Sequence, residues 1–387
     1  MADAPRKPDW NPRKEAVLKN QITAYDAMRA QCPVAWSDFQ HWTLFRHDDV
    51  MRVLKDHQTF SSAVSSHLSV PNGMDPPDHT PYRQVIEPYF SPQAMSQFEP
   101  ACRTIARNLV SSLPEGQSFD VVETFSRVFA LQIQCAFMGW PDSLHEPLRK
   151  WVLKNHQATL ARDGHAMADV AHEFDGYIHE LLETRRQAGA SAPRDVTTSL
   201  MEETVDGRTL TDKELTSLMR NWTVGELSTI SSSVSSLLCY LSEHPDLKQR
   251  LANDTPALPD AIDEILRMDA PLMSNRRVTT GDVEIGGRTI SAGETITILW
   301  ASANRDERVF GNPDAFCPHR NREHNLLYGA GIHVCPGAPL ARMELRVLLE
   351  EFLSAVDTLV PAPDALPERA AFPTGGFRYL PMIISKR

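Results

Sequence analysis

The stretch Tyr328–Arg342, YGAGIHVCPGAPLAR, places one cysteine between a glycine-rich loop and the start of an apolar segment. The residues that follow Cys335, APLARMELRVLLEEFL, have the pattern of an amphipathic helix. A sulfur at the start of a helix faces free backbone N–H groups and the positive end of the helix dipole, which both favour the thiolate. Gly329, Gly331 and Gly337 permit backbone conformations and close approaches that a side chain would block. The loop therefore suits a flat ligand that needs an anionic donor atom.

Three other interpretations of this cysteine stay open at this point. Cys335 could be a small buried residue without chemistry. A zinc site could draw on a short stretch rich in cysteine and histidine, although its spacing does not match the usual paired-cysteine zinc patterns; the residues concerned are Cys317, His319, His324, His333 and Cys335. A phosphate-binding loop is disfavoured because no Gly-Lys-Ser/Thr follows the glycines.

Composition limits the class of protein. The chain has 387 residues, 42% of them hydrophobic, and a net charge of −11, so broad nucleic-acid binding is not expected. Its six cysteines are scattered, which indicates free thiols in a reducing compartment. The N-terminal residues are polar, and no window offers about 18 consecutive apolar residues. We expect a soluble cytoplasmic protein with no membrane segment.

The chain shows no repeat and no long linker, so a single domain over residues 1–387 is expected. The pattern is mainly helical between residues 81 and 270, with a smaller β region near both ends. Short strands are predicted at 33–36 and 42–45, a short helix at 48–55, a hairpin around the two glycines of VEIGGRTI, further strands in ETITILW and YLPMIISK, and a helix in LPDAIDEILRMDAP.

The clearest predicted helix begins after Thr211. Thr211 and Glu214 have the spacing of a capping box, and the helical pattern continues to His244, ahead of Pro245. At a rise of about 1.5 Å per residue, a helix of this length extends for about 50 Å. It must cross the whole molecule.

The cysteine stretch resembles the haem-binding loop of the cytochrome P-450 family, Phe-Gly-x-Gly-x-His-x-Cys-x-Gly followed by Leu-Ala-Arg. Only the leading aromatic residue departs, because Tyr328 stands in place of phenylalanine. EILR supplies Glu264 and Arg267, matching the family's Glu-x-x-Arg, and PDAFCPHR resembles the segment whose arginine, here Arg320, joins that pair. The resemblance covers nearly the whole chain. It implies a triangular helical prism with haem b held between the long helix and the Cys335 loop.

The same resemblance assigns roles around the haem. Cys335 would be the axial thiolate ligand of the haem iron. His79 and Arg83 of DPPDHTPYR, together with Arg277 and His333, would bind the two haem propionates. The segments FSSAVSSHLSVPNGMDPPDH and NLLYGAGIHVCPGAPLAR look closest to the haem domains of self-sufficient members. No flavin or iron–sulfur segment is recognised before Arg387, so electrons are expected from a separate ferredoxin or flavodoxin with an NAD(P)H reductase.

The long helix departs from the family pattern. Members usually carry Ala/Gly-Gly-x-Asp/Glu-Thr, whose acid and alcohol relay protons, whereas this chain has WTVGELSTISSS. Aligned on Gly225, Leu227 occupies the acid position and Ser228 the alcohol position. One extra residue in a local bulge would instead make Glu226 the acid and Thr229 the alcohol. Alternatively, the hydroxyl groups only bond to carbonyls one turn earlier and Glu226 is a solvated carboxylate.

These features imply a monooxygenase that inserts one oxygen atom from O2 into an apolar small molecule, by hydroxylation or oxidative dealkylation. A peroxygenase using hydrogen peroxide and a non-catalytic haem-thiolate sensor are the alternatives. Arg342 and Arg346 are candidates for docking an acidic electron donor. The candidate substrate-pocket residues are Val64, His67, Leu68, Val70, Leu272, Met273 and Phe377.

Overall fold

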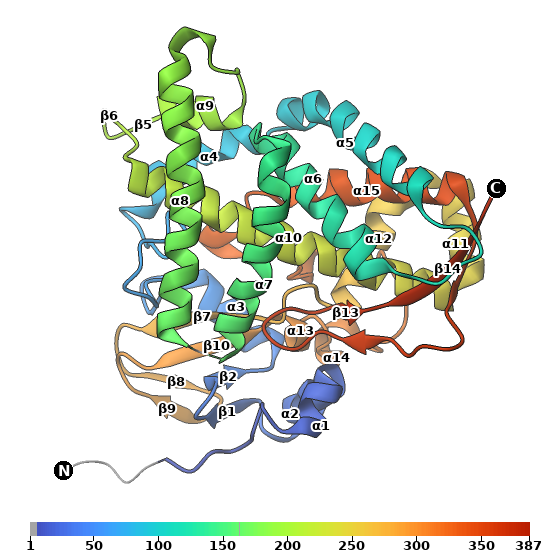
Figure 1. Ribbon diagram of the computed structural model, residues 1–387. Helices are drawn as coiled ribbons and strands as arrows, with labels where there is room; N and C mark the ends of the chain where they lie inside the picture. Colours follow the sequence, from blue (N-terminus) through green and yellow to red (C-terminus); the bar gives the residue numbers. More distant parts are fainter. Residues whose placement is uncertain (1–5, 162) are drawn as a thin grey trace.

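The computed structural model describes residues 6–161 and 163–387. Most of these residues lie in helices, and strands from both ends of the chain gather at one side of the helical body (Figure 1). The predicted division into a large helical part and a smaller β part is confirmed.

The helices follow the predicted order along the chain. Those of the N-terminal half are α1 Glu15–Lys19, α2 Gln21–Gln31, α3 His47–Lys55, α4 His79–Ile86, α5 Pro92–Ser112, α6 Arg127–Met138, α7 His145–Ala161, α8 Gly164–Ala188 and α9 Val196–Glu202. Those of the C-terminal half are α10 Asp212–Glu243, α11 Pro245–Asn253, α12 Leu258–Met268, α13 Trp300–Ala303, α14 Glu307–Phe310 and α15 Ala338–Ala355. A single π-helical turn, Val122–Ser126, precedes α6.

The strands form one larger sheet and several small ones. They are β1 Val34–Ser37, β2 His41–Leu44, β3 Phe60–Ser61, β4 Phe119–Asp120, β5 Thr204–Val205, β6 Arg208–Thr209, β7 Ser274–Thr279, β8 Val283–Ile285, β9 Arg288–Ile290, β10 Thr295–Leu299, β11 Val356–Pro361, β12 Glu368–Arg369, β13 Phe377–Tyr379 and β14 Pro381–Lys386. The larger sheet has the order β1-β2-β10-β7-β3, with β10 parallel to β2. Its pairing therefore joins the N-terminal strands to a segment about 250 residues later in the chain.

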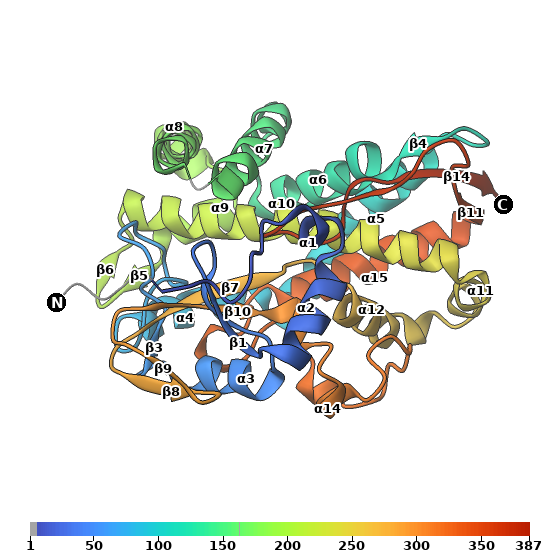
Figure 2. The ribbon, with the colours of Figure 1, turned by 90° about the horizontal axis from the view of Figure 1, so that it is seen from below.

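Helix α10 has 32 residues and runs through the middle of the molecule (Figures 1 and 2). Its predicted capping box is present: the Thr211 hydroxyl accepts from the Glu214 N–H at 3.3 Å, and the Glu214 carboxylate accepts from the Thr211 N–H at 2.7 Å. The reciprocal bonds satisfy backbone donors that the first turn leaves free. The cap fixes where the central helix begins.

The predicted hairpin is formed by β8 and β9. Gly286 and Gly287 both have positive φ, 57° and 73°, which the tight turn between the two strands requires. On the other side of the molecule, α15 packs against α5, and both contribute to the main hydrophobic core that surrounds α10. A bilayer-crossing helix would need a long apolar run, and none of the helices in the described ranges has one.

Candidate functional site

The Cys335 loop lies immediately before α15. The Cys335 N–H donates to the Tyr328 carbonyl at 2.8 Å, which closes the loop, and Gly331 has a φ of 72°. A Cβ at Gly331 would come within 2.1 Å of the Leu54 carbonyl oxygen, so only glycine fits there. The sequence pattern therefore fixes the loop through the backbone.

The Cys335 side chain remains accessible although many protein atoms surround it. Burial raises the pKa of the thiol, while the backbone N–H groups of Gly337 and Ala338 lower it. The predicted helix-terminus effect is thus present, but burial outweighs it in the polypeptide alone. A bound cation at the sulfur would reverse that balance.

Polar groups without partners gather next to this loop. His79, at the start of α4, lies with its ring centroid 4.6 Å from that of His333. The Nε2 atoms of both rings are buried and have no hydrogen-bond partner among the described residues. Arg277 of β7 is 5% exposed, and its charge, with burial, lowers the pKa of His333 to about 3. Arg83 donates to the Val334 carbonyl at 2.7 Å. Four sequence-predicted groups therefore meet in one place.

This cluster fits a ligand that carries carboxylates. Arg277 is buried, and its guanidinium donates to the Arg276 carbonyl but forms no ion pair among the described residues, which is costly, as are ring nitrogens without partners. Carboxylates placed among Arg277, His79 and His333 would relieve both costs. A thiol sulfur on the same loop adds the donor that a haem iron requires. The residues present therefore fit a haem.

One stripe of helix α10 is accessible in the middle of the helix, where the other side chains are buried or half-buried. Asn221, Gly225 and Thr229, four residues apart, are each at least partly exposed, and a Cβ at Gly225 would meet nothing within 4 Å. The Thr229 hydroxyl donates to the Gly225 carbonyl at 2.7 Å. The helix is regular here, so the bulge considered in the sequence is absent from this described segment.

Glu226 lies near Glu344 of α15, and its charge also acts on Cys335. It faces Glu344, which is completely buried, and both Glu344 oxygens and Glu226 Oε1 have no hydrogen-bond partner among the described residues. Their oxygens do not meet hydrogen-bond geometry, yet they are close enough to affect each other's pKa. Burial raises the pKa of Glu226 to about 7, and burial with the charge of Glu226 raises the pKa of Glu344 well above its usual value. Glu226 is therefore not a solvated carboxylate.

Ser228 makes a contact that the sequence did not predict. Its Oγ lies 2.8 Å from Nε2 of His156, which belongs to α7. Burial and the nearby Arg127 lower the pKa of His156 to about 4, so the imidazole is neutral at pH 7. Of the three predicted relay residues, Ser228 is the one whose side chain bonds to another helix.

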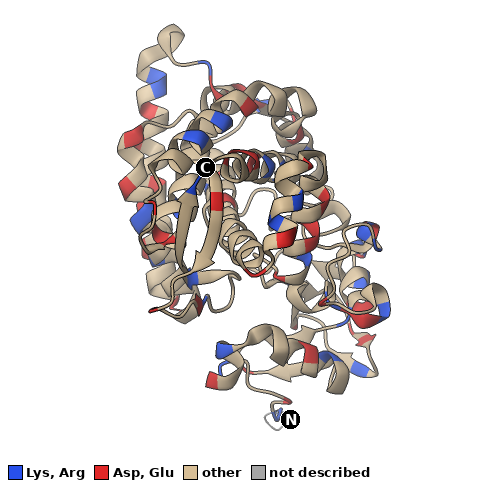
Figure 3. Cartoon of the chain, turned by 90° about the vertical axis from the view of Figure 1, so that its right-hand side faces the viewer, with Lys and Arg blue, Asp and Glu red and all other residues tan. Residues whose placement is uncertain are grey.

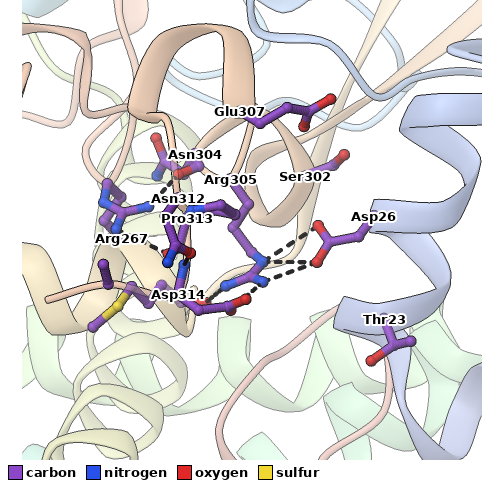
Figure 4. Close-up of polar contacts among 12 residues, drawn as sticks. Thr23, Asp26, Arg267, Ser302, Asn304, Arg305, Glu307, Asn312, Pro313 and Asp314 are labelled. Atoms are coloured by element: carbon purple, nitrogen blue, oxygen red, sulfur yellow. Dashed lines mark hydrogen bonds and ion pairs between the residues drawn. The ribbon is translucent and has the colours of Figure 1, made fainter.

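The Glu264–Arg267 pair is buried, with side chains 5% and 1% exposed and an N–O distance of 2.7 Å. Arg267 also donates to the carbonyls of Asn304 and Pro313 (Figure 4). The predicted third member is wrong: Arg320 donates to the carbonyls of Asn312 and Ala315 instead. Backbone geometry brings the Cys317 N–H to Glu264 at 2.9 Å, so the segment joins the pair through its main chain.

The predicted pocket residues do not form one group. Those before α4 are mostly exposed, whereas those near the C-terminus are half-buried or buried in separate cores. Val64, His67 and Leu68 are exposed, Leu272 is half-buried, Val70 and Phe377 lie in the main core, and Met273 packs with Tyr25 and Phe45. The Leu68 carbonyl and the Val70 N–H both bond to the Ser217 hydroxyl of α10, so this segment is anchored to the central helix.

The two predicted docking arginines are already paired. Arg342 bonds Asp263 at 2.9 Å and lies over the Tyr328 ring, while Arg346 bonds Glu99 and Glu350 at 2.6 and 2.8 Å. Acidic and basic residues also alternate over the side of the molecule that carries the C-terminus (Figure 3). A strongly basic patch at these arginines is therefore not present.

Fold and site together define a haem-thiolate protein of the kind the cysteine loop predicted. The chain matches the family described as cytochrome P450 over residues 40–371. It is 33% identical over 342 residues to the erythromycin C-12 hydroxylase of Saccharopolyspora erythraea, covering 84% of this chain and 85% of the relative. It is 30% identical over 351 residues to the linalool 8-monooxygenase of Pseudomonas putida, covering 84% and 86%. The chain belongs to the cytochrome P450 family.

Solved structures of cytochromes P450 have the same fold as this chain. A mutant of P450 EryK in complex with erythromycin B has a TM-score of 0.86 at 31% identity, covering 94% of this chain and 96% of that chain. A Bacillus megaterium cytochrome P450 in complex with testosterone has a TM-score of 0.86 at 25% identity, covering 95% and 98%. The predicted fold, and the assignment to the P450 monooxygenases, are confirmed.

Two residues of the site escaped the sequence analysis. Glu344 carried a usable signal, because it stands between Leu340 and Leu348 on the apolar face of the helix after Cys335, where an acidic residue is unexpected. His156 carried none. It is 72 positions from Ser228 in a polar segment, and only the packing of α7 on α10 reveals it.

Proposed function

We propose that this protein is a haem-dependent monooxygenase that transfers one oxygen atom from O2 to an apolar small molecule, by hydroxylation or oxidative dealkylation. The observation that carries the proposal is the meeting of His79, Arg277 and His333 beside the Cys335 thiol, in a chain of the cytochrome P450 family. Residues 1–387 would form one haem domain.

In this proposal, Cys335 would supply the thiolate that holds the iron of a haem b. The haem, when bound, supplies the activation of O2 and the oxidation of the substrate. His79, Arg83, Arg277 and His333 hold its carboxylates; the buried, unpartnered ring nitrogens of His79 and His333 support this role.

The middle of α10 would form the opposite wall. Gly225 leaves room for O2 and for the reacting carbon of the substrate, because a side chain there would extend into open space. Thr229 is held by its bond to the Gly225 carbonyl, and its oxygen can still accept a hydrogen bond. Ser228 is positioned to transfer protons, whereas Glu226 faces the carboxyl group of Glu344.

The substrate class is proposed from the relatives. The related enzymes are named for erythromycin and linalool, and a structural neighbour holds testosterone, all molecules with large apolar surfaces. We propose electron supply by a separate ferredoxin or flavodoxin with an NAD(P)H reductase in the cytoplasm. Shifts of the haem spin state on adding linalool, testosterone, erythromycin or a methyl-branched fatty acid would rank these compounds.

The carbon monoxide difference spectrum of the reduced protein tests the haem-thiolate centre. We expect a strongly red-shifted Soret band that is lost in Cys335→Ser and kept in the control Cys317→Ser, which changes a half-buried cysteine outside the loop. A band that survives in Cys335→Ser would overturn the ligand assignment. Bound zinc without haem, lost in both variants, would favour the zinc alternative.

Two alternatives give different results with the loaded protein. Product formation with hydrogen peroxide alone, and none with O2 and reductant, would identify a peroxygenase. Ligand-dependent spectra with no product under either condition would identify a sensor. The peroxygenase alternative is motivated by the absence of an acid at Leu227 and by the pairing of Glu226 with Glu344.

A further inference from the structure

The contact between Ser228 and His156 connects the central helix to α7. Neighbouring hydroxyl groups bond within α10: Thr229 donates to the Gly225 carbonyl, and Ser233 to the Thr229 carbonyl, both at 2.7 Å. Ser228, which is 6% exposed, instead meets Nε2 of His156 at 2.8 Å. Because Ser228 lies three residues after Gly225, it stands beside the open stripe of α10. The pair therefore spans from that stripe to a second helix.

The other ring nitrogen of His156 is free to exchange protons. Nδ1 has no hydrogen-bond partner among the described residues, and the ring is half-buried, not sealed. Arg127, which faces His156 from α6, is itself paired with Glu123. A neutral imidazole has one nitrogen that donates and one that accepts, so it can pass a proton from one side of the ring to the other.

The acid that usually takes part in the proton relay is missing here, and two neutral groups, Ser228 and His156, stand in its place. Leu227 cannot carry a proton, and Glu226 faces the carboxyl group of Glu344. The Thr229 hydroxyl donates its proton to the hydrogen bond with the Gly225 carbonyl. Among these side chains, the Ser228 hydroxyl is the one that contacts a group, His156, able to take up a new proton from water.

We propose that His156 and Ser228 form the proton path to the oxygen-activating side of the haem. Water delivers a proton to Nδ1 of His156, Nε2 releases its proton to Ser228 Oγ, and Ser228 passes its own hydroxyl proton onward. Each group gains one proton and loses one, and exchange with water restores the imidazole tautomer. The inference rests on the proposed function, because it assumes a haem held opposite Gly225.

The kinetic test uses the haem-loaded protein without any substrate. Oxygen consumption is measured with NADH, a heterologous ferredoxin and its reductase, at ferredoxin concentrations where the rate no longer rises. The variants are His156→Gln, Ser228→Ala and Ser228→Thr, with His172→Gln, an exposed histidine of α8, as the control. Each must first give the thiolate-type carbon monoxide band, since loss of that band reports on the proposed function and not on the relay.

We expect oxygen consumption to slow about tenfold or more in His156→Gln and Ser228→Ala, because positioned acid–base groups contribute roughly 100- to 10,000-fold to such steps. Ser228→Thr keeps the hydroxyl and should restore most of the rate, and His172→Gln should match the parent protein. Rates within twofold of the parent in both His156→Gln and Ser228→Ala would overturn the proposal.

A second readout is independent of turnover. In the diamagnetic carbon monoxide form, 15N-histidine spectra should show one resonance that disappears in His156→Gln and shifts in Ser228→Ala but not in Ser228→Thr. A His156 resonance that is unchanged by Ser228→Ala would contradict the contact itself. A shift without slower oxygen consumption would reduce the pair to a structural link between α7 and α10.

Discussion

The two walls of the proposed haem site are built in different ways. On the cysteine side, the loop is closed by the Cys335–Tyr328 backbone bond, and its shape depends on glycines such as Gly331. On the α10 side, a regular helix is combined with side-chain contacts to other helices, Ser228 with His156 and Glu226 with Glu344. The proposed iron-binding loop thus depends on local backbone geometry. Proton handling depends on a few side-chain partners, which can be exchanged without changing the fold.

The largest effect is expected at the buried ion pair of Glu264 and Arg267. Glu264→Gln leaves the Arg267 charge buried without its partner, so we expect a loss of about 3–5 kcal/mol in the free energy of unfolding. Urea unfolding followed by circular dichroism measures it. Glu183→Gln, at a pair with Arg186 whose side chains are 43% and 39% exposed, is the matched control and should change stability by less than about 1 kcal/mol. Equal effects would show that the buried pair contributes no more to stability than an exposed one.

The carboxylate-binding cluster gives the next effect. Arg277→Ala removes a buried cation, and hydrogen bonds to charged groups contribute about 1.5–3 kcal/mol, so haem loss to an excess of apomyoglobin should become about 10- to 100-fold faster. Arg378→Ala, at an exposed pair with Glu368, should leave the rate unchanged. If the two variants release haem equally fast, Arg277 does not contact the cofactor.

The carboxyl pair of Glu226 and Glu344 should make the free energy of unfolding depend on pH. Because burial raises the pKa of Glu226 to about 7, the folded protein holds a proton that the unfolded chain has released above its ordinary pKa. Stability should therefore fall as pH rises from about 4.5 to 7, by up to about 3 kcal/mol, because each unit of pKa difference is equivalent to about 1.4 kcal/mol. Glu226→Gln should flatten this part of the curve of unfolding free energy against pH. An unchanged slope would place the titration elsewhere.

The smallest effect is expected at the predicted docking arginines. Since Arg346 is already neutralised by Glu99 and Glu350, Arg346→Gln should change the rate of reduction by ferredoxin by less than about fivefold, the equivalent of 1 kcal/mol. Stopped-flow reduction at two salt concentrations measures it. A large decrease that salt abolishes would show that the arginine leaves its partners to dock the donor.

Apart from the cluster of His79, Arg277 and His333, which the family resemblance supplied, the predictions that succeeded concern residues close in sequence. The capping box of Thr211 and Glu214, the turn at Gly286 and Gly287 and the Cys335 loop are each set by backbone needs within a few residues. Those that failed required tertiary packing. Spacing could not tell that Arg320 bonds carbonyls instead of Glu264, because both partners lie within reach of its long side chain.

The α10 segment shows the same limit. Alignment offered two proton relays, and the regular helix supports neither bulge nor acid–alcohol pair. The decisive group, His156, belongs to another helix, and nothing in the sequence around Ser228 indicates it. Side-chain direction on a buried helix follows from its neighbours, which a single sequence does not specify.

A crystal structure of the reduced, carbon monoxide-bound protein tests the central contrast most directly, because one electron-density map contains both walls. We expect the sulfur of Cys335 bound to the haem iron and Ser228 Oγ still hydrogen-bonded to Nε2 of His156, at the 2.8 Å found here. Another axial ligand, or Ser228 bonded only within α10 with His156 turned away, would contradict the account.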